Sequence, residues 1–203
     1  MHSRRQILLG LTGLASVTGL ATAPTALWAA NTGYALDLDT TDVGFEFCIN
    51  GIWQTGSMPI TSSSIDLDPN RLDATRVSVS LNAAAAKTGF ILATRAMTGP
   101  EVLDVARFPS ISFTSRRIIL GPRGRLSGGA QVIGDLTLRG VTRPITLEAE
   151  LYRPIGSAPN DLSRLDFNLS GSLSRAAYGA SGFTTLVKDT VRLTIRASIQ
   201  QVD

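Results

Sequence analysis

Apolar and polar residues alternate strictly along several stretches of this chain. In residues 76–82, Val77, Val79 and Leu81 share one face of an extended segment, and polar residues occupy the other face. Because successive side chains of a strand point to opposite faces, this pattern predicts antiparallel sheet with one buried and one solvated face. The pattern recurs at residues 145–152, 165–173 and 191–200. Weaker strand patterns are found at residues 43–49, 53–60, 63–67, 111–120 and 131–138.

Turn-forming residues stand where these runs stop, which favours short connections and a meander. The sharpest signals are Asn50-Gly51 and Leu138-Arg139-Gly140-Val141, a tight hairpin in which Gly140 can take a positive φ. Eight or nine strands in one domain point to a β-sandwich or a closed barrel. Closure is favoured because it removes exposed strand edges.

Residues 88–106 interrupt the alternation with apolar residues at helical spacing. Gly99-Pro100 divides this stretch, which predicts two short helices inserted between strands. Such an insertion can plug one end of a barrel, form a lid or portal beside a ligand cavity, or do both.

The N-terminus has the features of an export signal. Arg4 and Arg5 precede a Leu, Gly, Ala and Thr-rich stretch without charge, which ends in small residues at Ala29 and Ala30. Paired arginines before a mildly apolar segment are typical of the twin-arginine type, whose translocase exports folded proteins. We therefore expect a signal at residues 1–29, a barrel domain at residues 31–203 and a periplasmic protein.

The alternative is an uncleaved membrane anchor. Glycines and Pro24 make this segment a poor match to the ~20 apolar residues that a spanning helix needs. Cleavage is therefore the favoured interpretation, after Ala29 or Ala30.

The net charge of the chain gives little information about binding partners once the predicted signal is removed. Residues 1–30 hold two of the 19 Lys and Arg residues and none of the 16 Asp and Glu, so the remainder carries 17 minus 16, or +1. The only basic cluster is Arg116, Arg117, Arg123 and Arg125, which flank a strand end and turn. A solvated hairpin tip explains them better than a nucleic-acid surface, so we predict no nucleic-acid partner.

Several kinds of site are disfavoured by residue content. Cys48 is the only cysteine, which excludes an internal disulfide and suggests a small buried side chain within an apolar strand. His2 is the only histidine and lies in the predicted signal, so Ser-His-Asp catalysis and histidine-bound metal are not expected in the mature chain. The acidic pairs at Asp37 and Asp66 lack a calcium-loop glycine. We predict neither a metal site nor a resident cofactor.

Several segments of the chain are more specific than strand alternation alone. The most specific is VIGDLTLRGVTRPITLEAEL at residues 132–151, where Gly140 makes a turn and Pro144 stands near a strand start. The others are YALD at 34–37, FPSISFTSRRI at 108–118, SRAAYGASGF at 174–183 and VKDTVRLTI at 187–195. With these segments, most of the chain resembles the YceI-like family of exported, lipocalin-like barrels.

The resemblance implies an all-β fold, an eight-stranded antiparallel lipocalin-like barrel with a short helical insertion. It also implies a long apolar cavity for a polyisoprenoid or similar amphiphile, and a protein that is not an enzyme. Strand phase alone shows which residues point inward and does not show how much space remains, because an eight-stranded barrel can be filled by side chains.

Candidate ligand contacts follow from strand phase and from the family pattern. The family pattern is altered at Asp42 and Ala96, but its Arg-x-x-aromatic-Gly segment is present as Arg175 to Gly179. Arg175 and Tyr178 are thus candidates for a polar or anionic ligand end, with a simple strand-turn arginine as the alternative. The predicted apolar lining is Phe45, Phe47, Trp53, Phe90, Met97, Phe113, Leu136, Leu147, Phe167 and Leu169.

The leading hypothesis is a carrier or sequestering protein for an isoprenoid lipid such as a quinone or polyprenyl phosphate. The alternatives are a scavenger of hydrophobic toxins or antibiotics, an interaction module for a membrane redox protein, and an enzyme using Asp104 or Asp189. Besides the lipid and the twin-arginine translocase, peripheral contact with a membrane and pairing into a homodimer are left open as partners.

Overall fold

The computed structural model describes residues 33–67, 71–122, 128–152, 158 and 161–202. The predicted signal, with Arg4 and Arg5, lies outside these residues, as do Arg123 and Arg125. The described strands are β1 Gly33–Leu36, β2 Asp42–Ile49, β3 Ile52–Ser57, β4 Ile60–Asp66, β5 Arg76–Asn82, β6 Lys87–Thr88, β7 Ser110–Leu120, β8 Ala130–Leu138, β9 Val141–Tyr152, β10 Arg164–Ser174 and β11 Thr190–Val202.

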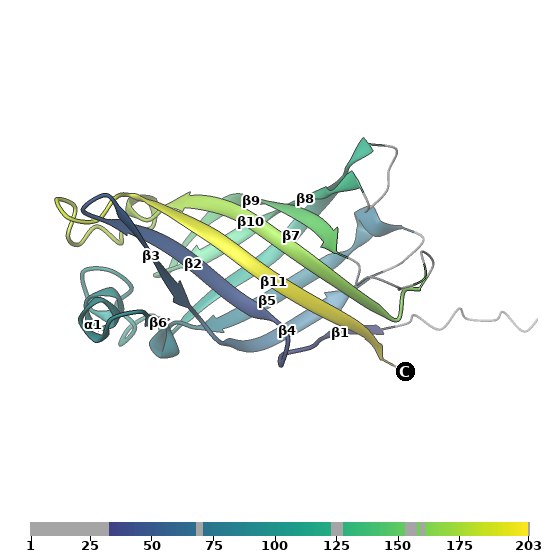
Figure 1. The fold of residues 1–203 in the computed structure, drawn as a ribbon, viewed down its shortest axis with the longest axis horizontal. Helices are drawn as coiled ribbons and strands as arrows, with labels where there is room; N and C mark the ends of the chain where they lie inside the picture. Colours follow the sequence, from purple (N-terminus) through teal and green to yellow (C-terminus); the bar gives the residue numbers. More distant parts are fainter. Residues whose placement is uncertain (1–32, 68–70, 123–127, 153–157, 159–160, 203) are drawn as a thin grey trace, which may run out of the picture. The chain divides into compact units, whose positions relative to one another are not determined.

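These strands form one antiparallel sheet that closes on itself (Figure 1). The hydrogen-bonded order runs from β1 through β4, β5, β7, β8, β9 and β10 to β11, and β11 pairs again with β1. Closure joins the two ends of the described chain, with Gly33 opposite Val202. The prediction of an eight-stranded antiparallel barrel is confirmed.

Three of the eight wall positions are each filled by two short strands. Both β1 and β2 pair with the same edge of β11, β1 at Ile199 to Val202 and β2 at Arg192 to Arg196. Their partners β4 and β3 likewise follow one another along the next position, and β5 and β6 share the one after that. The sequence predicted β2 to β5, but it predicted neither β1 and β6 nor these interruptions.

Two hairpin turns have the predicted backbone geometry. Arg139 and Gly140 have φ values of 54° and 75°, and Leu138 pairs with Val141. Asn50 and Gly51 have φ values of 48° and 85°. Positive φ at both central residues is the mark of the type I′ turn, whose twist suits two-residue hairpins.

The insertion between β5 and β7 contains one α-helix, α1 Ile91–Thr98, rather than the two predicted. Residues 99–107 form turns instead. Gly99 closes α1 by donating to the carbonyls of Arg95 and Ala96, and Asp104 has a φ of 50°. A left-handed residue that is not glycine ends helical geometry, so no second helix forms. In the described part of the chain, no helix has the length and apolar character needed to cross a bilayer.

The two ends of the barrel are built differently. At one end, here called the packed end, four buried residues form a cluster: Tyr34, Leu67, Leu165 and Ile199. The opposite end, here called the loop end, carries α1, the β2–β3 turn and residues 175–189 (Figure 1). A larger buried cluster includes Leu136 and Leu147, which point into the barrel. Cys48 is fully buried as a free thiol, as expected of a small apolar side chain.

Candidate functional site

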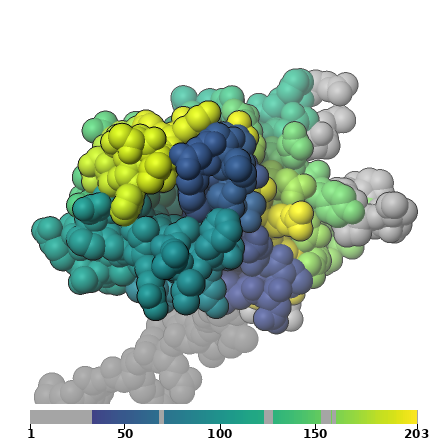
Figure 2. Space-filling view, turned by 60° about the vertical axis from the view of Figure 1, so that its left-hand side comes forward, coloured from purple at the N-terminus to yellow at the C-terminus, as the bar shows by residue number. Residues whose placement is uncertain are grey.

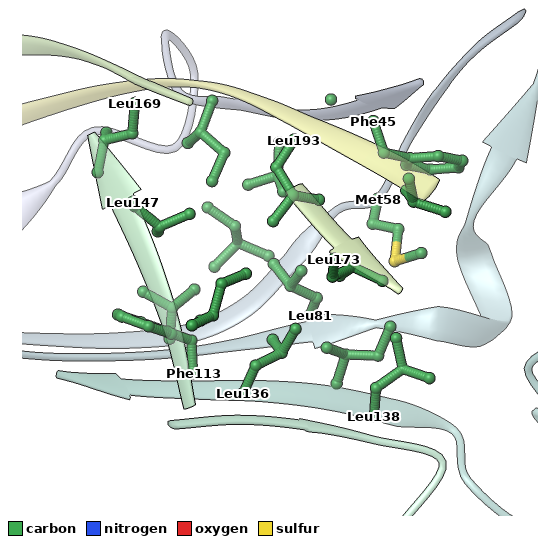
Figure 3. A pocket seen from close by; sticks show the side chains of 18 of the residues that line it. Phe45, Met58, Leu81, Phe113, Leu136, Leu138, Leu147, Leu169, Leu173 and Leu193 are labelled. Carbon is green, nitrogen blue, oxygen red and sulfur yellow. The ribbon is translucent and has the colours of Figure 1, made fainter. Parts of the chain in front are cut away.

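The barrel encloses a cavity of about 700 Å³. Its lining extends from Leu67 at the packed end to Phe183 at the loop end. Within the described chain, the only lining residues with polar side chains are Thr41, Thr75 and Arg175. Figure 3 shows labelled side chains from several strands turned toward the common space, among them Phe45, Phe113, Leu136, Leu147, Leu169 and Leu193.

The cavity follows from the alternation of the strands combined with small residues at some inward positions. Inward residues of neighbouring strands lie opposite one another, as Phe113 does with Leu136. Where the inward residue is small, space remains: Ala149 is paired with Ala130 on one side and Leu169 on the other. Gly171 leaves no such space, because Leu147 Cδ2 would be only 2.7 Å from a Cβ added there.

Ten of the twelve predicted contact residues lie in the cavity wall. They come from β2, α1 and its preceding residue, and β7 to β10, with Arg175 just after β10: Phe45, Phe47, Phe90, Met97, Phe113, Leu136, Leu147, Phe167, Leu169 and Arg175. Their contact with a ligand remains a prediction.

Trp53 is not part of the cavity wall, which corrects its predicted placement. In the β2–β3 ladder, Trp53 lies opposite Cys48, whereas the lining residue Phe47 lies opposite Gln54. Cross-strand partners share a face of the sheet, so Trp53 is on the outer face. There it stacks under the Arg192 guanidinium, whose carbon is 3.7 Å from a ring centroid.

Tyr178 is also outside the cavity wall. It lies in the 3-10 helix η5 Ala176–Tyr178, is 3% exposed and lines a separate surface depression with Arg143. Burial raises the pKa of Tyr178, and the nearby Arg143 cation opposes that rise. The η5 turn directs this side chain away from the alternating strand faces, so strand phase could not place it.

Arg175 holds the loop-end segment in place and also lines the cavity. Its guanidinium donates from Nε to the Lys188 carbonyl at 3.1 Å, from Nη1 to Ala180 at 2.6 Å and from Nη2 to Val187 at 3.1 Å. Burial lowers the pKa of Arg175, while the Asp189 carboxylate raises it. Since guanidinium has five N–H groups, one N–H on each terminal nitrogen remains beyond these three bonds. These bonds show Arg175 in its alternative role, as an arginine that holds the turn after a strand. The remaining N–H groups leave room for a ligand contact as well.

Comparisons with known proteins agree with the fold. The family model described as the YceI-like domain matches residues 34–199. The chain belongs to the YceI-like family. A UPF0312 protein of Yersinia pestis (strain Pestoides F) is 30% identical in an alignment of 166 residues that covers 75% of this chain and 84% of that relative.

Solved structures share the YceI-like barrel. BcnA from Burkholderia cenocepacia superposes with a TM-score of 0.68 at 18% identity, over 81% of this chain and 99% of BcnA. A polyisoprenoid binding domain from Saccharophagus degradans gives 0.61 at 14% identity, over 84% and 99%. The YCEI protein of Campylobacter jejuni gives 0.57 at 18% identity, over 97% and 99%. At these identities the similarity shows a common fold.

Part of the lining of this YceI-like barrel was not predicted. Ala180, Phe183, Leu186 and Val187 come from the segment between η5 and β11, and Met58 lies between β3 and β4. None of these residues is in a strand, so the period-two pattern gave no indication of their direction. The available signal was the occurrence of three large apolar residues, Phe183, Leu186 and Val187, in a loop.

The two aspartates considered as acid or base lie outside the cavity lining of the YceI-like barrel. Asp104 is buried and pairs with Arg107 at 3.5 Å. Asp189 accepts from the Ala176 N–H at 2.8 Å. Among the described residues there is no group of His, Cys, Asp and Glu side chains arranged to hold a metal ion.

Proposed function

We propose that this protein is exported to the periplasm and holds an isoprenoid or other amphiphilic lipid in its barrel, as a carrier or sequestering protein. A quinone and a polyprenyl phosphate are the ligand types that we favour. The observation that carries the proposal is the apolar cavity with a single charged side chain, Arg175, in its described lining.

The size and chemistry of the cavity support a lipid. A volume of about 700 Å³ falls within the roughly 300–1,000 Å³ of ligand pockets. A cavity lined almost wholly by apolar side chains is poorly suited to water and well suited to hydrocarbon. Each buried methylene contributes ~0.8 kcal/mol, so an isoprenoid chain can bind tightly without specific polar contacts.

The cavity chemistry supports binding rather than catalysis. Among the described lining residues, none carries a carboxylate, a thiol or an imidazole. The remaining N–H groups of Arg175 can contact the polar end of an amphiphile, a carbonyl or a phosphate, while the hydrocarbon fills the barrel. The polyisoprenoid binding domain of Saccharophagus degradans, which shares this fold, is consistent with such a ligand.

Extraction of bound lipid tests the proposal directly. We expect gently purified protein to show a bound amphiphile by native mass spectrometry, and added ubiquinone or polyprenol to raise its melting temperature. Ala149→Phe should abolish both effects, because Ala149 is an inward residue and the larger side chain occupies ligand space. Its control is Glu150→Phe, at the next residue on the outer face. Absence of extractable lipid together with no thermal shift would overturn the carrier proposal.

Export has its own test. Replacing Arg4 and Arg5 by lysine should retain the protein in the cytoplasm if the translocase reads the twin-arginine motif. Cell fractionation with an antibody to the barrel measures the outcome. Undiminished export of the double variant would contradict the twin-arginine part of the proposal and leave the lipid-binding part intact.

A further inference from the structure

Large apolar side chains are exposed together at the loop end. Their exposed fractions range from 43% for Phe183 to 73% for Leu92. They come from the β2–β3 hairpin, the start of α1 and the segment before β11. We call this set the apolar rim: Ile52, Phe90, Ile91, Leu92, Phe183 and Leu186.

Backbone contacts tie the parts of the rim together. The Asn50 N–H donates to the Leu186 carbonyl at 2.9 Å, which joins the β2–β3 turn to the segment before β11. The Gly182 N–H donates to the Glu101 carbonyl at 2.8 Å, which joins that segment to the turn after α1. Figure 2 brings this end forward, with the dark blue hairpin, the yellow segment and the teal insertion next to one another.

The rim is continuous with the cavity. Phe90, Leu92, Phe183 and Leu186 line the cavity and are also exposed. Ile52 and Ile91 are exposed at 65% and 69% and do not line it. An apolar surface thus leads from the interior of the barrel to the outside of the molecule.

The segments that carry this surface have a small excess of basic side chains. In the insertion and the segment before β11, the exposed charged residues are Lys87, Arg95, Arg107 and Lys188 on the basic side and Glu101 and Asp189 on the acidic side. The buried Asp104 pairs with Arg107. Apolar side chains flanked by lysine and arginine are the arrangement by which proteins bind the interface of anionic bilayers.

We propose that the apolar rim docks on an anionic lipid bilayer and inserts Ile52, Ile91 and their neighbours among the acyl chains. Docking turns the mouth of the cavity toward the membrane, so that a lipid passes between the bilayer and the barrel without crossing water. The inference rests on the proposed function, because the bilayer is the phase from which an isoprenoid enters the cavity.

Vesicle flotation tests the docking. The full chain is mixed with phosphatidylcholine vesicles, with or without phosphatidylglycerol, and the bound fraction is measured. We expect Ile52→Gln/Ile91→Gln to weaken binding to the anionic vesicles by roughly tenfold or more, since two exposed isoleucines lose their contact with lipid. Leu38→Gln is the control, because Leu38 is 57% exposed between β1 and β2, away from the rim. Every variant keeps the same N-terminal segment, so its contribution to vesicle binding is common to all.

The outcomes separate docking from ligand binding. A double variant that still carries extractable lipid but no longer floats with vesicles supports the docking surface, because neither isoleucine lines the cavity. Equal flotation of the parent protein, the double variant and Leu38→Gln overturns it, even if all three contain lipid. Protein that floats through the rim but contains no lipid supports docking and overturns the proposed function instead. A loss of melting temperature in the double variant is checked by repeating the assay with Ile52→Ala/Ile91→Ala, which keeps the local backbone and removes most of the apolar contact.

Discussion

The packed end of this barrel buries its apolar residues, whereas the loop end leaves several of them exposed. At the packed end, Leu165 and Ile199 are 2% and 4% exposed, and the Tyr34 hydroxyl donates to the Leu162 carbonyl at 2.9 Å. At the loop end, α1 has no buried residue and begins with two exposed apolar side chains. The difference places a closed apolar cluster at one end of the barrel and an exposed apolar surface next to the cavity at the other.

The largest expected effect is on stability at the packed end. Leu165→Ala should lower the free energy of unfolding by about 2–5 kcal/mol, because a fully packed side chain is replaced by a void. Leu92→Ala at the loop end should change it by less than about 0.5 kcal/mol, because Leu92 is mostly exposed. Urea unfolding of both variants measures the contrast. Equal losses would mean that the two ends are not energetically different.

Arg175 joins the end of β10 to residues 180–188 at the loop end through three hydrogen bonds. Arg175→Met should cost about 2–3 kcal/mol, because one buried and two partly buried carbonyls lose a charged donor. Amide exchange should accelerate at Asn50 and Lys188, whose N–H groups bond to the neighbouring segment. Arg175→Lys keeps the charge and should recover little, since an ammonium cannot reproduce the planar fork. Unchanged exchange at these two amides would show that the loop is held by other contacts.

The packed end should also weaken in alkali. Burial raises the pKa of Tyr34 above its ordinary value of 10.0, so the native state holds this proton at a pH where the unfolded chain releases it. The contribution is complete below pH 10 and is lost as the pH rises, by at most about 1.4 kcal/mol per pH unit. Unfolding at increasing pH should show a shallower decline in Tyr34→Phe than in the parent protein. Tyr152→Phe, at an exposed tyrosine, is the control and should leave the slope unchanged.

The smallest effect is expected in acid at the loop end. Hydrogen bonds from Ser174 and the Ala176 N–H lower the pKa of Asp189 below its ordinary value of 3.8. Its contribution is therefore complete above that value and is lost as the pH falls below it. Because Asp189 is exposed, the loss should stay under about 1 kcal/mol. In Asp189→Asn the free energy of unfolding should not show this loss as the pH falls. If the variant and the parent protein lose stability equally in acid, the carboxylate does not hold the turn.

Sequence reasoning succeeded where a residue's direction is set by strand phase. Residues 76–82 were predicted as a strand with the bounds that β5 has, and the Arg139-Gly140 turn was predicted from its glycine. In these cases the local pattern and the closed sheet require the same geometry. The barrel as a whole followed from the number of strands and from the family resemblance.

Prediction failed at positions that the local pattern does not determine. Trp53 was assigned to the interior from strand phase, but its register with Cys48 places it on the outer face. The second helix was predicted from apolar spacing, but Asp104 takes a left-handed conformation. Phe183 lines the cavity from a loop that Arg175 holds by hydrogen bonds. This loop has no period-two pattern, so its position could not be predicted from the sequence.

The barrel cannot close without β11, and this has a consequence for folding during synthesis. β11 pairs with β1, β2 and β10, so the sheet closes only after β11 has been synthesised. Until then the growing sheet has two open edges and an uncovered apolar inner face, which is the condition that favours aggregation. A nascent chain lacking β11 has no closed interior, so the cavity forms only once β11 has joined the sheet.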